Sequence, residues 1–132
     1  QQFTANWLKY FVGLPMHCGL RSDVSDFRKC VRSIKLDPIS EFLYWRMNWH
    51  LEHHMYAGIP CYNLKKLHSL VAYDMPKVRT LRESWKEMLE TKRQQDIDPS
   101  YEFDTPLPKK RSKLNKNDIS LMNSIGAVSY TH

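Results

Sequence analysis

The chain has the sequence NWHLEHH at residues 48–54, so three of its six histidines lie within five positions. Helix signals enclose this stretch. An Asp-Pro pair at 37–38 is typical of a helix start, and the Gly and Pro within residues 58–60 are typical of a helix end. We therefore predict a single helix over residues 38–57. At about 100° per residue, this helix places the three histidines within an arc of roughly 100° on one face.

The position of His50, His53 and His54 on one helical face favours a metal site. Imidazole is a good ligand for iron, zinc and copper, and burying three unpaired imidazoles would cost several kcal/mol. His50 and His54 stack one turn apart, whereas His53 and His54 diverge enough to reach two different metals. A single histidine on an apolar face is more often a hydrogen-bonded core residue, which is what we expect for His68.

Three common zinc motifs do not fit the sequence. No histidine is followed directly by glutamate, so HExxH is absent, and Trp49 stands where the reversed motif HxxEH needs its first histidine. The nucleobase deaminase pattern fails because Leu64 replaces its second cysteine. Glu52 lies about 160° from His50 around the helix, so we expect it to support the site or the fold rather than bind the metal.

The overall composition is that of an ordinary globular chain, with 42% hydrophobic and 26% charged residues and a net charge of +6. It excludes a disordered chain, collagen and a disulfide-rich miniprotein. Three cysteines without CxxC spacing indicate a reducing compartment. The longest apolar run is too short for a membrane-spanning helix, which excludes a complete polytopic membrane protein but not a piece of one. The first residue is Gln1, so we expect a fragment or a processed product.

The predicted fold class is all-α, because no run of residues has the two-residue period of strands. The chain divides into three parts. Residues 1–16 form the end of an apolar helix, stopped by Gly13 and Pro15, and residues 17–95 carry the histidine stretch. Residues 96–132, with several prolines and a basic run, are expected to form an extended basic tail.

Two more helices are predicted after the histidine stretch. One follows Asn63 and covers residues 64–73, and the other follows Asp74 and Pro76. The apolar face of the second consists of Val78, Leu81, Trp85, Met88 and Leu89. We expect this face to pack against the rest of the domain.

The residues around the histidines resemble the last histidine box, HxxHH, of membrane fatty acid desaturases. The similarity extends over residues 14–106 and is strongest in the box itself. Its segments are Met16–Leu20, Phe42–Asn48, Trp49–Tyr56, Ile59–Pro60, Asn63–Leu64 and Tyr101–Pro106. The same superfamily includes hydroxylases and ketolases, which the box alone does not separate from desaturases.

The resemblance implies a histidine-box fold whose helical C-terminal part lies on the cytoplasmic face of a membrane. It also implies a non-haem di-iron centre, with His50, His53 and His54 as iron ligands. His17 lies where related enzymes place an additional histidine ligand. No catalytic residue beyond these ligands and no further cofactor-binding residue is expected. The implied reaction uses O2 and external electrons to introduce a double bond into an acyl chain.

The resemblance also implies partners. The substrate would be an acyl-lipid, an acyl-CoA or an acyl-carrier conjugate, and the electron donor a ferredoxin, cytochrome b5 or a rubredoxin. Residues 1–16 would be the end of a membrane or interfacial helix in contact with lipids. Thirteen of the twenty Lys and Arg residues lie in residues 62–116, which agrees with a cytoplasmic side. Nucleic acid is not among the expected partners.

Two readings outside this family remain as alternatives. The basic run Lys109–Lys113 is typical of a small basic helical binding protein, although that reading leaves the histidines unexplained. A structural zinc module is the other, and it lacks the usual Cys and His spacing.

The desaturase family has two earlier histidine boxes, and neither occurs in this chain. Four histidines cannot saturate two irons. We therefore expect the other ligands and most membrane helices to lie upstream of Gln1. We expect the 132 residues alone to bind no stable di-iron centre and to have no activity.

Overall fold

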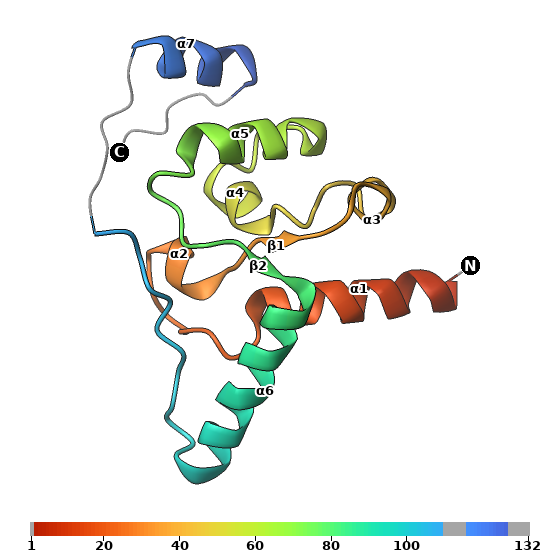
Figure 1. Ribbon diagram of the computed structural model, residues 1–132, viewed down its shortest axis with the longest axis vertical. Helices are drawn as coiled ribbons and strands as arrows, with labels where there is room; N and C mark the ends of the chain where they lie inside the picture. The colour runs from red at the N-terminus through yellow and green to blue at the C-terminus, as the bar shows by residue number, and fades with distance from the viewer. Residues whose placement is uncertain (1, 110–115, 127–132) are drawn as a thin grey trace.

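The computed structural model describes residues 2–109 and 116–126, and this part of the chain is mostly helical (Figure 1). The all-α prediction is therefore confirmed at the level of helical content. In chain order the elements are α1 (Gln2–His17), α2 (Phe27–Cys30), β1 (Ile34–Lys35), α3 (Pro38–Leu43), α4 (His50–Met55), the 3₁₀ turn η1 (Cys61–Asn63), α5 (Leu64–Val71), β2 (Arg79–Thr80), α6 (Leu81–Ile97) and α7 (Lys116–Ser124).

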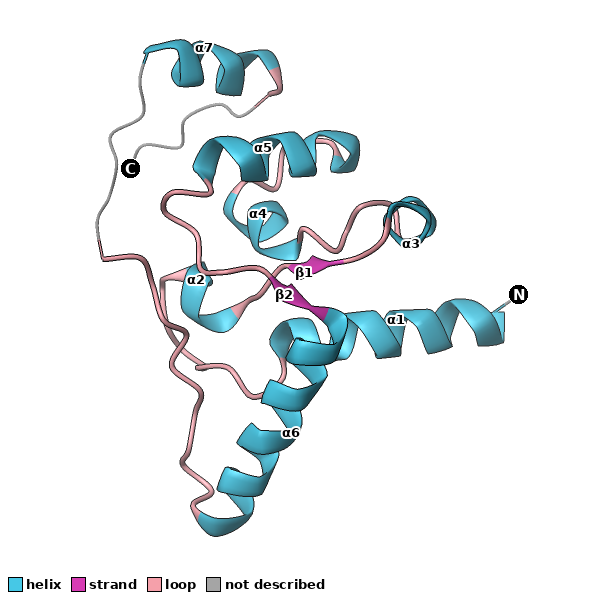
Figure 2. Ribbon diagram, viewed as in Figure 1, coloured by secondary structure: helices cyan, strands magenta, loops and turns pink. Residues whose placement is uncertain are grey.

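Two very short strands lie at the middle of the molecule. β1 and β2 pair in parallel, with Ile34 opposite Arg79 and Lys35 opposite Thr80. Figure 2 shows them between α4 and α5 on one side and α1 and α6 on the other. The larger core lies around α4, α5 and α7, and a smaller one joins α1 to β1. The larger core consists of Val31, Trp49, Leu51, Ile59, Leu64, Leu67, Val71, Met75, Met122 and Ile125.

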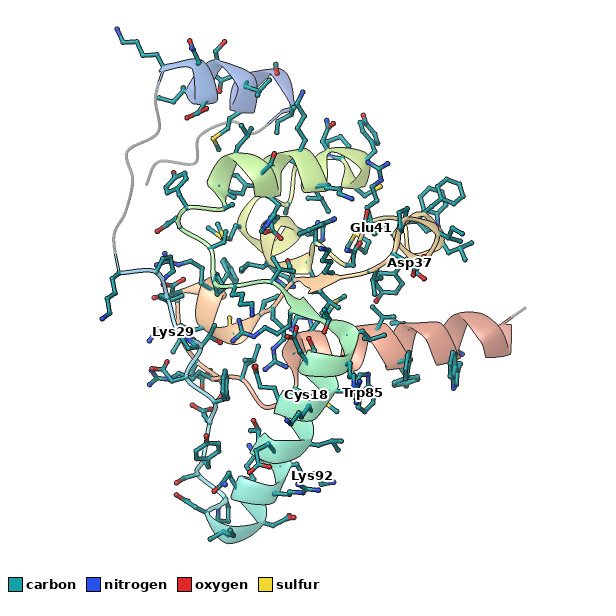
Figure 3. The ribbon with its side chains drawn as sticks, viewed as in Figure 1. Cys18, Lys29, Asp37, Glu41, Trp85 and Lys92 are labelled. Carbon is teal, nitrogen blue, oxygen red and sulfur yellow. The ribbon has the colours of Figure 1, made fainter. Side chains whose placement is uncertain are left out.

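The predicted end of the first helix is wrong, because α1 continues through Gly13 and Pro15 to His17. Proline has no backbone N–H, so the carbonyl of Phe11, four residues earlier, lacks its usual partner. The indole Nε1 of Trp85 donates to that carbonyl at 2.9 Å. Figure 3 shows Trp85 where α6 meets α1. A contact from a distant helix therefore replaces the missing bond, and local sequence signals cannot reveal it.

The prediction of one helix over residues 38–57 is also wrong. α3 ends at Leu43, and a turn separates it from α4. The N–H of Arg46 donates to the carbonyl of Glu41, and the N–H of Trp45 donates to that of Phe42. These two bonds are those of a Schellman motif, with Trp45 in the left-handed position at φ 55°. Glycine usually occupies that position, so the sequence contains no signal for this helix end.

The later helices lie close to their predicted places. α5 matches the prediction for residues 64–73, but α6 begins at Leu81 rather than directly after Pro76. Thr80 and Glu83 form a capping box that fixes this start. The predicted apolar face is only partly correct, since Leu89 is half exposed while the polar Ser84 and Thr91 are buried.

The C-terminal part differs partly from an extended tail. Residues 98–101 form a turn, residues 102–108 contain no helix, and the N–H of Phe103 donates to the carbonyl of Gly19 at 3.1 Å. Residues 116–124, however, form α7, which packs on the core through Met122. Most of the basic run at 109–113 lies outside the described residues. The three-part division itself stays a prediction.

None of the described helices combines the length and the apolar character that crossing a bilayer requires.

Candidate metal centre

Two segments far apart in the sequence bring three histidines together. His17 is the last residue of α1, while His50 and His54 lie one turn apart on α4. Nε2 of His50 lies 2.9 Å from Nε2 of His17 and 3.2 Å from Nε2 of His54. Ligand atoms of all three residues lie within 4.8 Å of one another. His17 is exposed and His50 is partly buried, so the cluster lies at the surface of the described part.

His53 does not belong to this convergent group. Its ring centre lies 5.9 Å from that of His50 and 6.1 Å from that of His54. The rings of His50 and His54 are closer, at 4.7 Å. His53 therefore flanks the three-histidine cluster, a placement that suits the prediction that it reaches a different metal from His54.

The opposite side of α4 is held by a buried carboxylate. Glu52 is completely buried, and its two oxygens contact the hydroxyl of Ser33 and Nδ1 of His68. The Ser33 hydroxyl also accepts a hydrogen bond from the N–H of Leu51 at 3.0 Å. The hydroxyl thus satisfies an N–H of the first turn of α4 that has no acceptor within the helix. Trp49, the N-cap residue, provides no side-chain acceptor. These contacts fix the rotation of a helix only six residues long, and His68 has the structural role expected of it.

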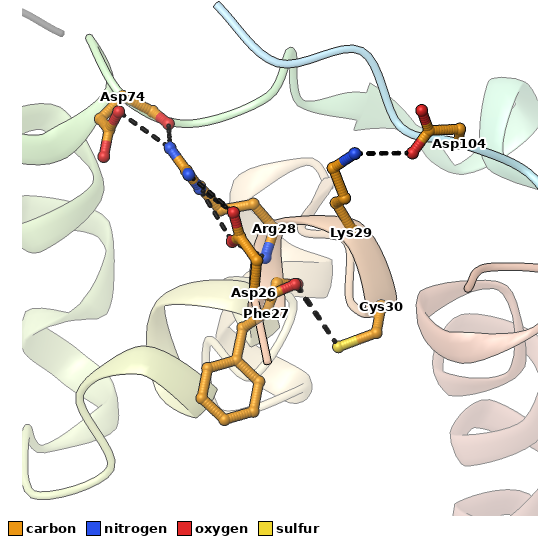
Figure 4. Close-up of polar contacts among 7 residues, drawn as sticks. All are labelled: Asp26, Phe27, Arg28, Lys29, Cys30, Asp74 and Asp104. Atoms are coloured by element: carbon orange, nitrogen blue, oxygen red, sulfur yellow. Dashed lines mark hydrogen bonds and ion pairs between the residues drawn. The ribbon is translucent and has the colours of Figure 1, made fainter. Parts of the chain in front are cut away.

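A further wall of the site comes from α2, where the ring of Phe27 lies 5.7 Å from that of His54. Figure 4 shows how α2 is anchored. Arg28 binds Asp26 at 2.7 Å and Asp74 at 2.9 Å, while Lys29 binds Asp104 at 2.9 Å. These ion pairs tie α2 to the chain after α5 and to the C-terminal extended segment.

The environment of the cluster favours neutral imidazoles. Burial, followed by the positive charge that His17, His54 and His53 can carry, lowers the pKa of His50 to about 4. Burial and His54 lower the pKa of His17, and burial and His53 lower that of His54. The neutral imidazole is the form that binds metals. At neutral pH the cluster is therefore ready to act as a ligand set.

The nitrogen positions fit a metal ion better than a hydrogen-bond chain. An imidazole Nε2 carries one hydrogen or one lone pair, so Nε2 of His50 cannot make good hydrogen bonds with both neighbours. Two nitrogens that each lie about 2.1 Å from one metal are about 3.0 Å apart when the angle between them is 90°. The separations of 2.9 and 3.2 Å agree with that value.

The other nitrogen of His50 departs from the usual arrangement around a metal. Metal-bound histidines almost always donate their second ring N–H to a carboxylate, carbonyl or water. Nδ1 of His50 is buried and has no hydrogen-bond partner among the residues that the structure describes. The described residues therefore supply the converging nitrogens of the cluster but no acceptor behind its central histidine.

Sequence reasoning missed two residues that shape the site. Ser33 and Arg32 are both buried, and they lie next to each other just before β1. The one available signal was an arginine and a serine between the apolar Val31 and Ile34. Such a pattern does not show which distant groups the two side chains contact.

These observations define the chain as a helical protein with a cluster of three histidines that could hold a metal ion. A model of the fatty acid desaturase family matches residues 2–85, which include all the histidines of the site. Because this match covers more than half of the sequence, the chain belongs to the fatty acid desaturase family, and the family resemblance is confirmed. No curated protein and no solved structure matches the chain.

Proposed function

We propose that this chain is the C-terminal part of a desaturase that introduces a double bond into an acyl chain. In this proposal His17, His50, His53 and His54 are ligands of a non-haem di-iron centre. Membership of the family supports an oxidoreductase of this type. The remaining iron ligands would come from polypeptide outside these 132 residues.

The observation that carries the proposal is the convergence of three Nε2 atoms from two distant segments. His17 and the α4 histidines meet within the region that matches the family. The separations of the His50 nitrogen from those of His17 and His54 fit one coordination sphere, and His53 lies beside them for a second ion. Histidines that served only the core of the fold would not need to bring three ring nitrogens from two helices together.

The chemistry divides between the metal and the chain. When bound, the irons would activate dioxygen and supply the oxidising power to remove hydrogen from an unactivated acyl chain. The chain would hold the neutral imidazoles in place, through Glu52 behind α4 and through the contacts at the end of α1. The ring of Phe27 would shield His54 on one side.

The remaining assignments follow from the same proposal. The substrate would be an acyl-lipid, acyl-CoA or acyl-carrier conjugate, and the electrons would come from a ferredoxin, cytochrome b5 or rubredoxin. The chain would lie on the cytoplasmic face of a membrane. Large exposed apolar side chains on α1, including Trp7 and Tyr10, support contact with lipid.

The test is titration of the 132-residue chain with Co²⁺, which binds imidazole and reports its coordination through its visible absorption. We expect one ion per chain. Replacing a residue that orients a metal-binding side chain, without binding the metal itself, typically weakens metal affinity about 10–100-fold. His50→Ala should weaken Co²⁺ binding by more than that. His17→Ala and His54→Ala should weaken binding as well, because each removes one of the three converging nitrogens.

The matched control is His132→Ala, which removes a histidine outside the described residues and should leave the affinity unchanged. Equal Co²⁺ binding by wild type and His50→Ala would contradict the proposal. So would unfolding of the metal-free chain that zinc reverses, which is the behaviour of a structural zinc module. In the full-length enzyme, His53→Ala should abolish O2-dependent turnover while circular dichroism shows intact helices.

A further inference from the structure

One residue, Arg32, caps the C-terminal end of α1, where His17 lies. Nη1 of Arg32 donates to the carbonyl of Pro15 at 2.6 Å, and the backbone N–H of Arg32 donates to the carbonyl of Met16 at 3.0 Å. The last carbonyls of a helix have no partner within it and lie at the negative end of the helix dipole. Arg32 thus holds the two carbonyls that directly precede His17.

Arg32 is itself held by a partly buried carboxylate. It is 5% exposed, and its Nη2 donates to Oε1 of Glu87 on α6 at 2.9 Å. The other oxygen of Glu87 accepts a hydrogen bond from Nε of Arg79 on β2 at 3.2 Å. Burial lowers the pKa of Arg32, and the charge of Glu87 opposes that shift. Glu87 therefore stabilises the buried guanidinium charge and fixes its direction.

The neighbouring residue performs the matching task for α4. Ser33 contacts the N–H of Leu51 and the carboxylate of Glu52, whereas Arg32 contacts the end of α1. Consecutive residues of an extended chain point to opposite sides. Two adjacent residues thus tie the two ligand-bearing helices to the same piece of backbone, one on each side.

We infer that Arg32, held by Glu87, is a positioning residue of the metal centre that sets the place of His17 against the α4 histidines. The inference rests on the proposed function, because it assumes that the three histidines bind one metal. Neither Arg32 nor Glu87 contacts an imidazole in any hydrogen bond of the structure's described part. Their effect on a bound metal would pass through the backbone that carries His17 rather than through a direct contact with an imidazole.

The experiment is a double-mutant cycle on Co²⁺ affinity, using Glu87→Gln and His17→Ala in the 132-residue chain. Glu87→Gln should weaken Co²⁺ binding at least about tenfold, as replacement of groups that orient ligands typically does. It should also change the visible band of the bound ion. In the His17→Ala background, Glu87→Gln should change the affinity by less than about twofold, because there is no His17 left to position.

Glu41→Gln is the matched control. Glu41 is 5% exposed and binds Lys65 at 2.9 Å, so the change also breaks a buried carboxylate pair, but on α3 (Figure 3). It should leave the Co²⁺ affinity within about twofold of wild type. Arg32→Lys provides a second variant, because an ammonium cannot reproduce the planar fork of contacts to Pro15 and Glu87. Circular dichroism confirms that each variant is folded.

The possible outcomes distinguish the positioning role of Arg32 from the existence of the metal site. Equal weakening by Glu87→Gln with and without His17, or equal weakening by Glu41→Gln, would show a general loss of stability and overturn the inference. Unchanged affinity in both Glu87→Gln and Arg32→Lys would overturn it too, while the metal site would stand. Absence of Co²⁺ binding by the wild-type chain would overturn the three-histidine metal site, on which the proposed function and this inference rest.

Discussion

At the scale of single residues, His50 is the centre of the cluster. Its Nε2 lies near the corresponding nitrogens of His17 and His54, and its own pKa is the most strongly lowered of the three. Burial is the larger cause of the lowered pKa, and the crowding of three imidazoles resists protonation further. A bound cation would take the place of that proton.

The lowered pKa of His50 predicts how the stability of the metal-free chain responds to acid. The pKa of His50 is about 4 in the folded chain and about 6.5 when unfolded. Between these two pH values the unfolded chain binds more protons than the folded chain. The free energy of unfolding therefore rises as the pH rises and falls as the pH falls. We expect urea denaturation in the presence of a chelator to show decreasing stability from pH 7 to pH 4.

The control for this prediction is His50→Gln, because a glutamine side chain does not titrate. It should flatten this part of the stability curve, and the difference between the two curves should lie within the window from about pH 4 to pH 6.5. An identical pH dependence in wild type and His50→Gln would contradict the prediction.

The predictability of the site from sequence depends on how local each ligand is. His50, His53 and His54 follow from spacing on one helix, since the i, i+3 and i+4 positions share a face. His17 came only from the family resemblance, because no local pattern links residue 17 to residue 50. Arg32 was not predicted, since its role exists only once Pro15 and Glu87 are nearby.

At the scale of elements, the wrong boundaries have a common physical origin. Sequence rules place helix ends at glycine and proline, but α1 passes Pro15 with the help of Trp85. α3 ends at a Schellman motif whose left-handed residue is Trp45. In both places a specific contact of the backbone overrides the usual preference for glycine or proline at a helix end. α5 and α6 end without such contacts, and they lie close to their predicted positions.

The turn after α1 yields a prediction about the element that carries His17. Gly19 has φ +75°, and a Cβ there would lie 2.9 Å from Cγ2 of Thr91. Gly19→Ala should therefore lower the free energy of unfolding by about 1–3 kcal/mol, through backbone strain and the clash with α6. Thermal or urea denaturation measures the effect, and Thr91→Ser should recover part of it by removing the methyl group.

The control for this change is Gly58→Ala, because a Cβ at Gly58 meets nothing within 4 Å. That variant should be neutral or slightly stabilising. Equal destabilisation by both alanines would mean that the packing of Gly19 against Thr91 contributes nothing.

At the scale of the whole molecule, one face of the described part is unusually apolar. Phe42, Leu43, Trp45 and Tyr62 border an open groove of about 360 Å³, and each is more than 60% exposed. Arg46 borders the same groove. Aromatic side chains beside a basic one are typical of surfaces that meet a lipid headgroup region. This face, which we call the α3 surface, supports the proposed membrane location.

The α3 surface predicts a measurable affinity for lipid. We expect the chain to co-sediment with vesicles that contain anionic phospholipid. Phe42→Ser and Trp45→Ser should each reduce partitioning by about tenfold, because each removes a large apolar side chain from the lipid contact. Ile97→Ser is the control, since Ile97 is 81% exposed but lies at the end of α6. Equal loss in all three variants would count against lipid contact through this surface.

The contacts at the end of α1 have a consequence for the order in which the molecule takes shape. His17 emerges early during synthesis, but the groups that hold its segment, Arg32, Glu87, Thr91 and Phe103, emerge later. A chain released before Phe103 would contain every candidate ligand and still lack the tether at Gly19. The candidate ligand His17 is thus held by groups that are synthesised after the histidines of α4, so under the proposed function metal loading would follow the synthesis of those groups.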